Sequence, residues 1–488
     1  MTRSHARFTT GLLAATLVAL GATAAGAQSA PPPSPTTLTP HQKAAREIYK
    51  QLIEINTVDS VGSVTKAAQA MAARFRTAGF PASDVQVLVP DGHPTKGNLV
   101  VRYRGRAGAS TKKPILLLAH LDVVAAQRED WPRDPFVLHE ENGYFLGRGT
   151  SDDKAMAAIF VANLLQMKQQ GILPDRDIIL ALTADEENGD SNGAEWLANK
   201  HKALIDAAYA INEGGGGALA DGKPIYQSVQ AAEKVYVDFT IVATNPGGHS
   251  SVPRPDNAIY ELADALLRVS HYQFPVALND VTRPFLEQTA KVEPRPEMAA
   301  AMRALAADPA DSAAAATLST DPRFASMLRT SCVATRLSGG HAYNALPQRA
   351  TANINCRIAP TSSFEATRDA LVRAIADTGI HIDYTIPPNG KFGATVTPVD
   401  PELLAVTTAL TKQMWGDIPV IPTMSTGATD GKYMRAVGIP TFGVSGLFSE
   451  AGETNAHGRD EKLRVKSFYE GLSFLDQLVR RLSGVPAA

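Results

Sequence analysis

Acidic and imidazole side chains follow several apolar runs of this sequence, at positions where short strands are expected to end. Three of these runs are 115–119, 178–182 and 210–212. In an open α/β sheet, binding sites form at the carboxyl ends of the strands, so we expect these side chains to share one cleft. Several carboxylates in one cleft repel one another unless cations lie between them. The sequence therefore predicts a metal centre, with candidate residues at three strand ends and one helix start: His120, Asp122, Asp152, Asp153, Glu186, Glu187 and Glu213.

The residue types also indicate which metal the centre would hold. Imidazole and carboxylate together suit zinc or a similar first-row ion, whereas an all-oxygen set would favour calcium or magnesium. His120 supplies one imidazole, and His457, in the loop 453–458, offers a second. Taken singly, a strand-end histidine is usually structural and a glutamate pair before a helix is usually a solvated cap. The prediction therefore depends on the whole set.

The elements that must position these side chains alternate between helix and strand. Apolar periodicity predicts helices and strands in the first half of the chain, the helices over 41–55, 63–78 and 154–170 and the strands over 98–104, 115–119 and 177–183. Such alternation is typical of an α/β fold, so we expect a mostly parallel sheet flanked by helices.

A second unit interrupts this alternation. The pattern changes to a strand over 236–243, a helix over 257–269, a hairpin around Asn344 and a helix over 363–378. From about residue 401 the helix–strand alternation resumes, and it ends in an amphipathic helix over 465–482. We therefore expect one domain inserted in another: a catalytic domain from residues 41–233 and 395–488, and an α+β domain from residues 234–394.

The net charge bears on the partners of the protein, and the N-terminal residues bear on its location. Lys plus Arg is 47 and Asp plus Glu is 49, a net charge of -2, which favours neither a nucleic-acid nor an anionic-membrane partner. Residues 1–27 have the basic start, short apolar run and small-residue end of a secretory signal peptide. Residues 28–40 form a Pro-rich linker. We expect an exported protein, in a bacterial periplasm and free of the membrane after signal cleavage.

The sequence contains two cysteines, Cys332 and Cys356. Two thiols exclude a disulfide-scaffold fold and any site that needs several thiolates. The two flank the expected hairpin in a compartment where disulfides persist, so either one bridge or two small buried side chains would fit.

These residues resemble the M20 metallopeptidases, a family that includes aminoacylases, carboxypeptidases and a desuccinylase. The matching stretches run in the family's order over residues 41–482: 120–122, 131–136, 147–154, 185–187, Glu213, 247–251, 344–347 with Arg357, 427–430 and 455–457. The inserted domain is longer than in simple members, between about 274 and 329, as in the secreted carboxypeptidase S and N-acyl-amino-acid hydrolase branch.

The resemblance implies a role for each residue of the metal centre. Two zinc ions would be bridged by Asp152 rather than by its neighbour Asp153, with cobalt or manganese as alternatives. His120 and Glu213 would complete one zinc site, and Glu187 and His457 the other. Asp122 would orient the His120 imidazole. Glu186 would be the general base that takes a proton from water and passes it to the leaving amine.

The resemblance also implies that residues 234–394 form a lid and dimerisation domain. His249 would reach the site of a partner subunit and stabilise the oxyanion. Asn344 and Arg357 would grip a substrate carboxylate. If the extra segment 274–329 covered the usual dimer surface, this delivery of His249 would be in doubt.

The predicted function is hydrolysis of the amide bond next to a C-terminal amino acid, by a metallocarboxypeptidase or dipeptidase. A glutamate at position 213, rather than an aspartate, is typical of carboxypeptidases and acylases in this family. An N-acyl-amino-acid amidohydrolase is the alternative. A non-catalytic periplasmic binding protein on the same fold is a different class, which Glu186 argues against, because a binder needs no base aimed at water.

Overall fold

The computed structural model describes residues 37–188, 190–384 and 396–485. The expected signal peptide, most of the linker and the end of the expected inserted domain lie outside these residues. No helix in the described part of the chain is long and apolar enough to cross a membrane.

The main sheet has ten strands, in the order β1-β2-β6-β3-β7-β17-β9-β8-β18, with β16 also paired to β9. Their bounds are β1 Val85–Leu88, β2 Asn98–Tyr103, β3 Ile115–His120, β6 Ile178–Thr183, β7 Tyr209–Asn212, β8 Gly217–Ala220, β9 Lys223–Glu233, β16 Val420–Ser425, β17 Thr441–Gly443 and β18 Phe448–Ser449. The α/β architecture is confirmed, but the sheet is mixed. The pairs β6–β3, β3–β7, β7–β17, β9–β16 and β8–β18 are parallel, whereas β1–β2, β2–β6, β17–β9 and β9–β8 are antiparallel.

Alternate residues of the central strands pack on opposite faces of this sheet. In β3, Ile115 and Leu117 belong to one buried cluster and Leu116 and Leu118 to another. The first cluster is covered by α1 (Pro40–Glu54), α2 (Val64–Thr77), α3 (Lys154–Gln169), α12 (Pro401–Trp415) and α14 (Val465–Leu482). The second is covered by α4 (Gly193–Lys200), α5 (Lys202–Ile205) and α13 (Gly431–Ala436). A strand apolar on both faces is the signature of a sheet buried between helices.

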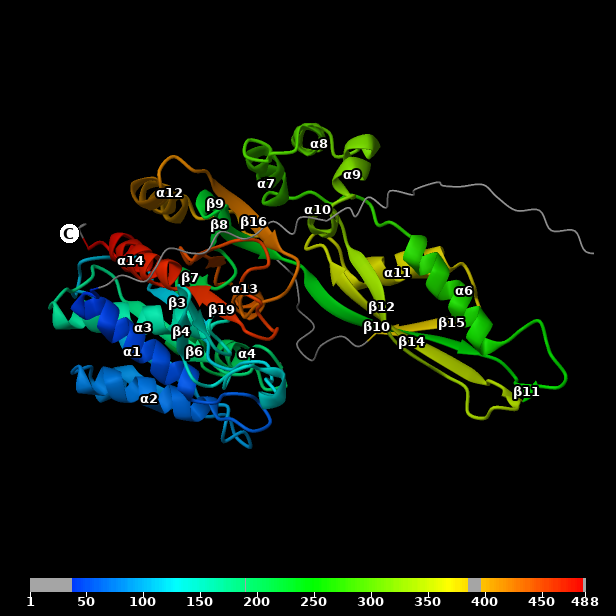
Figure 1. Cartoon of the computed structure of the whole chain (residues 1–488), viewed down its shortest axis with the longest axis horizontal. Helices are drawn as coiled ribbons and strands as arrows, with labels where there is room; N and C mark the ends of the chain where they lie inside the picture. The colour runs from blue at the N-terminus through cyan, green and yellow to red at the C-terminus, as the bar shows by residue number, and fades with distance from the viewer. Residues whose placement is uncertain (1–36, 189, 385–395, 486–488) are drawn as a thin grey trace, which may run out of the picture.

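A second sheet lies to one side of the main sheet (Figure 1). It has the order β12-β14-β10-β15 and is antiparallel throughout, with β10 Val235–Thr244, β12 Ser331–Gly339, β14 Arg349–Ile358 and β15 Ile380–Tyr384. Helices α6 (Ala258–His271) and α11 (Phe364–Ile375) cover one face. The connection of the β12–β14 hairpin contains β13 (Ala345–Leu346), which pairs with β11 (Gly248–His249). These two short strands, which we call the hairpin tip, extend from the far end of the sheet (Figure 1). The chain leaves the main sheet after β9 and returns to it in β16, which lies beside β9.

Cys332 and Cys356 face each other on β12 and β14 and form a disulfide, with their Cα atoms 4.1 Å apart. Of the two arrangements that the sequence left open, the structure has the bridge.

The extra segment of the inserted stretch forms four helices: α7 Thr282–Thr289, α8 Pro296–Ala307, α9 Ser312–Leu318 and α10 Pro322–Leu328. We call residues 282–328 the helical insert. It has its own apolar cluster, which also includes Ile421 of β16. The helical insert therefore packs on the edge of the main sheet.

A third, small sheet, β19-β5-β4, consists of β4 His139–Glu141, β5 Tyr144–Leu146 and β19 Lys462–Arg464. It joins the segment before α3 to the segment before α14. Two short 3-10 turns, Ala82–Asp84 and Arg128–Asp130, complete the described elements.

Candidate metal centre

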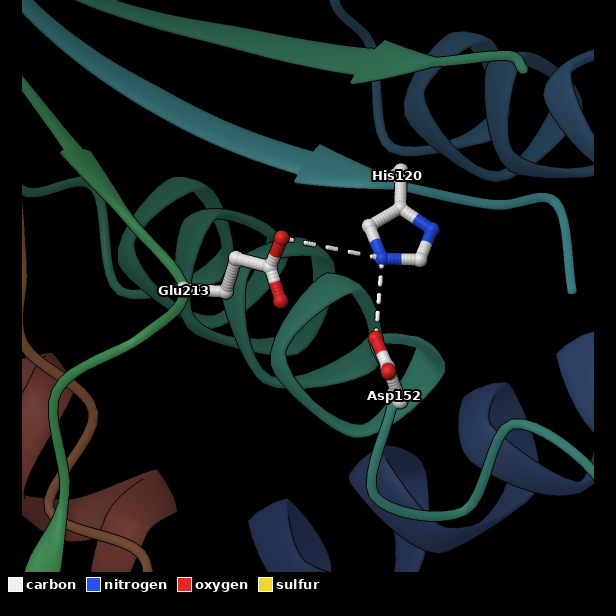
Figure 2. Close-up of side chains that lie close together, drawn as sticks. All are labelled: His120, Asp152 and Glu213. Atoms are coloured by element: carbon white, nitrogen blue, oxygen red, sulfur yellow. Dashed lines mark hydrogen bonds and ion pairs between the residues drawn. The ribbon is translucent and has the colours of Figure 1, made fainter. Parts of the chain in front are cut away.

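Three side chains meet at the carboxyl end of the parallel strands. His120 is the last residue of β3, and Glu213 follows β7, the neighbouring parallel strand. Asp152 lies just before α3, and all three point toward one another (Figure 2). The Nε2 atom of His120 is 3.0 Å from Oδ1 of Asp152 and 3.8 Å from Oε1 of Glu213. One imidazole and two carboxylates thus present ligand atoms to a common point.

A second group of three uses the other oxygen of Asp152. Nε2 of His457 is 3.0 Å from Oδ2 of Asp152 and 3.0 Å from Oε2 of Glu187. In each group the ligand atoms lie within 4.8 Å of one another. Asp153, joined to Asp152 by a cis peptide bond, is buried and belongs to neither group. The two groups are the ligand sets that the family resemblance implies, with Asp152 shared between them.

Asp122 contacts one residue from each group. Nδ1 of His120 is 3.1 Å from the backbone oxygen of Asp122 and 3.6 Å from its carboxylate. The other carboxylate oxygen of Asp122 accepts a hydrogen bond from the backbone N–H of Glu187 at 2.9 Å. A donor contact at Nδ1 leaves the Nε2 lone pair of His120 directed at the metal centre.

A buried glutamate that the sequence analysis missed organises the loop around Asp152. Oε1 of Glu461 accepts hydrogen bonds from the backbone N–H groups of Ser151 at 2.7 Å and Asp152 at 3.1 Å. Oε2 accepts from the N–H of Gly149 at 3.0 Å and from Arg148 at 2.7 Å. Glu461 stands four residues after His457, but no spacing rule in the sequence singles it out.

The electrostatics of the centre show that its negative charge is in excess. Burial raises the pKa of Glu186 to about 8 and that of Glu187 to about 7, with nearby carboxylates adding to both shifts. Burial also raises the pKa of Glu213 well above its usual range. The hydrogen bond to Asp152 is the main cause that raises the pKa of His457 to about 9. Without added cations, these three glutamates therefore tend to hold protons near neutral pH, and bound divalent cations would replace those protons.

A cavity of about 300 Å³ gives access to the two groups. Glu186 lines it together with ligand candidates from both groups. The cavity is also lined by residues of β16 and the loop after it: Thr423, Met424, Ser425, Ala428 and Thr429. Ala428 and Thr429 belong to the matching stretch 427–430, whereas the β16 residues were not singled out in the sequence, because β16 reaches the site through a pairing with β9 across almost two hundred residues of chain.

The three predicted residues of the inserted stretch lie elsewhere. His249 is exposed in the hairpin tip, where the carbonyl of Asn344 accepts a hydrogen bond from the N–H of Ser250. Arg357 lies opposite Tyr236 at the other end of β14, with its guanidinium 4.8 Å from the centre of the Tyr236 ring. Ten strand residues span roughly 30 Å. The extended β14 therefore holds Asn344 and Arg357 of one chain apart, and their expected grip on a substrate carboxylate stays a prediction.

The residues present fit two divalent metal ions. Each group offers one imidazole and two carboxylates, with Asp152 counted in both, and three protein ligands leave further positions free for water or substrate. The raised pKa values of Glu186, Glu187 and Glu213 show that their ionised forms are unfavourable in this centre without cations. Such ions would neutralise the charge of the ionised carboxylates.

Comparison with known proteins agrees with this geometry. The model of Peptidase family M20/M25/M40 matches residues 116–481. Probable carboxypeptidase S-like 2 of Dictyostelium discoideum is 27% identical over 88% of both chains. Aminoacylase-1 of Pongo abelii is 25% identical over 90% of this chain and 95% of its own. The human N-fatty-acyl-amino acid synthase/hydrolase PM20D1 is 25% identical over 75% of this chain and 74% of its own.

The fold is also that of a solved structure, the M20 family metallo-carboxypeptidase Sso-CP2 from Sulfolobus solfataricus. The TM-score is 0.65 at 17% identity, over 89% of this chain and 98% of the other. A family match over most of the chain, together with two carboxylate–imidazole groups that share one aspartate, leads to one conclusion. The chain is a hydrolase that belongs to peptidase family M20/M25/M40.

Proposed function

We propose that the chain is an exported di-zinc hydrolase that cleaves the amide bond next to a C-terminal amino acid, as a metallocarboxypeptidase or dipeptidase. The observation that carries this proposal is Asp152, whose two oxygens face two different imidazole–carboxylate groups in the cavity that Glu186 lines. His120, Asp152 and Glu213 would hold one ion, and Asp152, Glu187 and His457 the other. Bound there, the ions supply Lewis acidity that activates water and polarises the scissile carbonyl.

Glu186 is proposed as the general base. Its carboxylate lines the cavity and belongs to neither ligand group, so its lone pairs are available for a proton. It takes a proton from the attacking water and delivers it to the nitrogen of the leaving amine. Asp122 keeps the His120 ring and the Glu187 backbone in place during this transfer.

The hairpin tip would act on a partner subunit in a homodimer. The backbone N–H of Ser251 donates to Nδ1 of His249 at 3.2 Å, which places the proton of a neutral imidazole on Nε2. That proton is available for a developing oxyanion. Because Asn344 lies beside His249, the partner subunit would supply both residues to the site of this chain. Arg357 would act at the site of its own chain. The edge strand β12 supports a dimer contact, since Val333 is 59% and Leu337 70% exposed there.

Export rests on residues 1–27, which have the pattern of a secretory signal peptide. In a Gram-negative host, cell fractionation should recover the full-length gene product in the periplasm with an N-terminus at Gln28. Recovery of an uncleaved cytoplasmic chain would contradict this part of the proposal.

An N-acyl-amino-acid amidohydrolase is the second candidate. It is favoured by the similarity to aminoacylase-1 and to an N-fatty-acyl-amino acid synthase/hydrolase. Both candidate reactions hydrolyse an amide whose amine side is an amino acid, so the same residues would serve both. The acyl side of the substrate distinguishes them.

The test is metal analysis with a substrate panel. The purified mature chain should contain about two equivalents of zinc and hydrolyse dipeptides or N-acyl amino acids, with activity lost on chelation and restored by zinc. Glu186→Gln should keep the metal and lose at least about 100-fold in kcat, whereas Glu47→Gln, an exposed change on α1, should behave like the wild type. A metal-loaded chain that cleaves no member of the panel would favour the binding-protein class instead.

A further inference from the structure

A second, larger cavity adjoins the metal centre. It has a volume of about 670 Å³, within the range of small-molecule sites, and lies between the helical insert and the edge of the main sheet. Thr423 and Met424 of β16 line both cavities. Two other segments also connect the cavities. In the segment after β7, Gly214 lines the first cavity and Gly216 the second. In the loop 454–457, His457 lines the first cavity and Thr454 the second. We call this second cavity the insert pocket.

The wall of the insert pocket is mainly apolar. Phe285, Val292, Phe324 and Met327 of the helical insert and its turns line the pocket together with Tyr226 of β9 and Leu447, which precedes β18. The helical insert is fixed in this position, because Ile421 of β16 is fully buried in the same apolar cluster as Phe285 and Phe324. The pocket is therefore built into the fold between two packed layers.

The charged side chains among the described lining residues are all compensated. Arg295 is 2.6 Å from Glu293 and 3.1 Å from Asp321, and Arg323 is 2.9 Å from the same Asp321. Glu450 accepts a hydrogen bond from the N–H of Gly222 at 2.7 Å and is 3.7 Å from Arg464. A substrate carboxylate or ammonium group placed here would find its counter-charge already engaged, and its desolvation would be unfavourable.

We propose that the insert pocket binds the uncharged, apolar group on the carbonyl side of the scissile amide. This inference rests on the proposed function and assigns the two halves of the substrate. The amino acid that leaves carries the carboxylate, which the insert pocket cannot neutralise, so that half lies away from it. The acyl half extends from the metal centre past Thr423 and Met424 and buries its apolar surface against the helical insert. Either a fatty acyl chain or an apolar peptide side chain has this chemistry.

The test measures kcat/KM over two substrate series that share the same leaving amino acid. In one series the acyl group lengthens from acetyl to dodecanoyl; in the other a peptide carries leucine, aspartate or lysine before the scissile bond. For the wild type we expect kcat/KM to rise about fourfold per methylene that enters the pocket, and leucine to be preferred over either charged residue. If kcat/KM rises much more with the length of the acyl chain than from a charged residue to leucine in the peptide series, the occupant is a fatty acyl chain. If the preference for leucine is the larger effect, the occupant is a peptide side chain.

Two variants fill the pocket from opposite walls. Val292→Trp acts from the turn after α7 and Ala218→Trp from β8, and both positions are half-buried. Each should remove the gain from the longer acyl chains and leave kcat/KM for the acetyl substrate within about twofold of the wild type. The matched control is Leu173→Trp, at a position that is 54% exposed and outside the pocket lining, and it should change neither series.

The outcomes separate this inference from the proposed function. If the wild type hydrolyses the acetyl substrate and shows no dependence on the acyl group, the pocket assignment is wrong and the proposed function stands. Retention of the full chain-length gain by both folded variants, checked by their zinc content, also overturns the assignment. If the zinc-loaded wild type hydrolyses neither series, the proposed function fails and this inference fails with it.

Discussion

The carboxylate of Glu461 accepts a hydrogen bond from the backbone N–H of Asp152 at 3.1 Å. Asp152 faces both ligand groups, so its backbone position sets the geometry of both. Glu461 is fully buried and also pairs with Arg148 at 2.7 Å, which fixes the carboxylate itself. The residue that holds the shared ligand in place therefore comes from a segment more than three hundred positions away.

Substitution of Glu461 should weaken metal binding without removal of any ligand. Glu461→Gln replaces one acceptor oxygen by an N–H₂ group, which opposes the backbone donors of Gly149 or of Ser151 and Asp152. We expect zinc affinity to fall by about 10- to 100-fold, as for other changes behind a metal ligand. Competition with a chromogenic chelator measures this, with Glu47→Gln as the exposed control. Wild-type affinity in a folded Glu461→Gln chain would contradict the positioning role.

Metal removal should make stability depend on pH between pH 5 and 7. In the metal-free chain the pKa of Glu186 is about 8 and that of Glu187 about 7, both raised mainly by burial. A carboxyl group with a raised pKa holds its proton in the folded state and loses it on unfolding, so stability falls as the pH rises above about 4.5. The pKa of His457, raised to about 9, acts in the same direction above pH 6.5, because the folded state again binds more protons.

The expected loss for the chelated chain is on the order of 3 kcal/mol from pH 5 to pH 7. Denaturant titrations with and without chelator measure it. The zinc-loaded chain should not show this loss, because bound cations keep the carboxylates ionised at both pH values. An equal stability of the chelated chain at pH 5 and pH 7 would contradict the predicted charge excess.

The strand ends were predictable from the sequence because local rules decide them. The run 115–119 is apolar at every position, which requires a strand buried on both faces, and His120 follows at its carboxyl end. Neighbouring parallel strands then bring Glu213 to His120. The family resemblance, rather than spacing, placed His457 at Asp152, since no local pattern relates residues 305 positions apart.

The features that the sequence analysis missed depend on long-range packing. The antiparallel pairing of β9 with β17 depends on how β9 folds back beside β17, which leaves no local pattern. The placement of the helical insert depends on Ile421, a single apolar residue of β16 that looks like any other strand residue. The separation of Asn344 from Arg357 within one chain was not foreseen either, because a sequence motif does not state how far an extended strand carries its ends apart.

Replacement of Lys234 should stabilise the protein at neutral pH. Lys234 is 1% exposed, and burial, with a contribution from Arg357, lowers its pKa to about 8. The folded state disfavours the ammonium form, so the penalty is complete below pH 8 and disappears as the pH rises toward the unfolded value near 10.5. Lys234→Met should therefore be more stable than the wild type by about 2 kcal/mol at pH 7, with the difference shrinking toward pH 10.5.

Denaturant titrations at pH 7 and pH 10 measure this difference. Lys223→Met, on the exposed start of β9, is the matched control and should change stability by less than about 0.5 kcal/mol. A destabilised Lys234→Met chain at pH 7 would show that the hydrogen bond from Nζ to Ser331, at 3.3 Å, outweighs the cost of the buried charge.

Disruption of the β12 edge should abolish activity while the metal centre stays intact. Leu337 is 70% exposed on β12, an edge strand of its sheet in the described part of the chain. Leu337→Glu therefore costs the isolated chain little but places a desolvated charge in a dimer contact across β12. Because the hairpin tip with His249 lies at the far end of its own sheet (Figure 1), each site of the proposed dimer depends on its partner. Sedimentation should show a monomer that retains two zinc equivalents and has lost at least about 100-fold in kcat. Leu173→Glu, exposed on the main-sheet side, should remain dimeric and active. A monomeric Leu337→Glu chain with full activity would show that the site is complete within one chain and that His249 takes no part in the reaction.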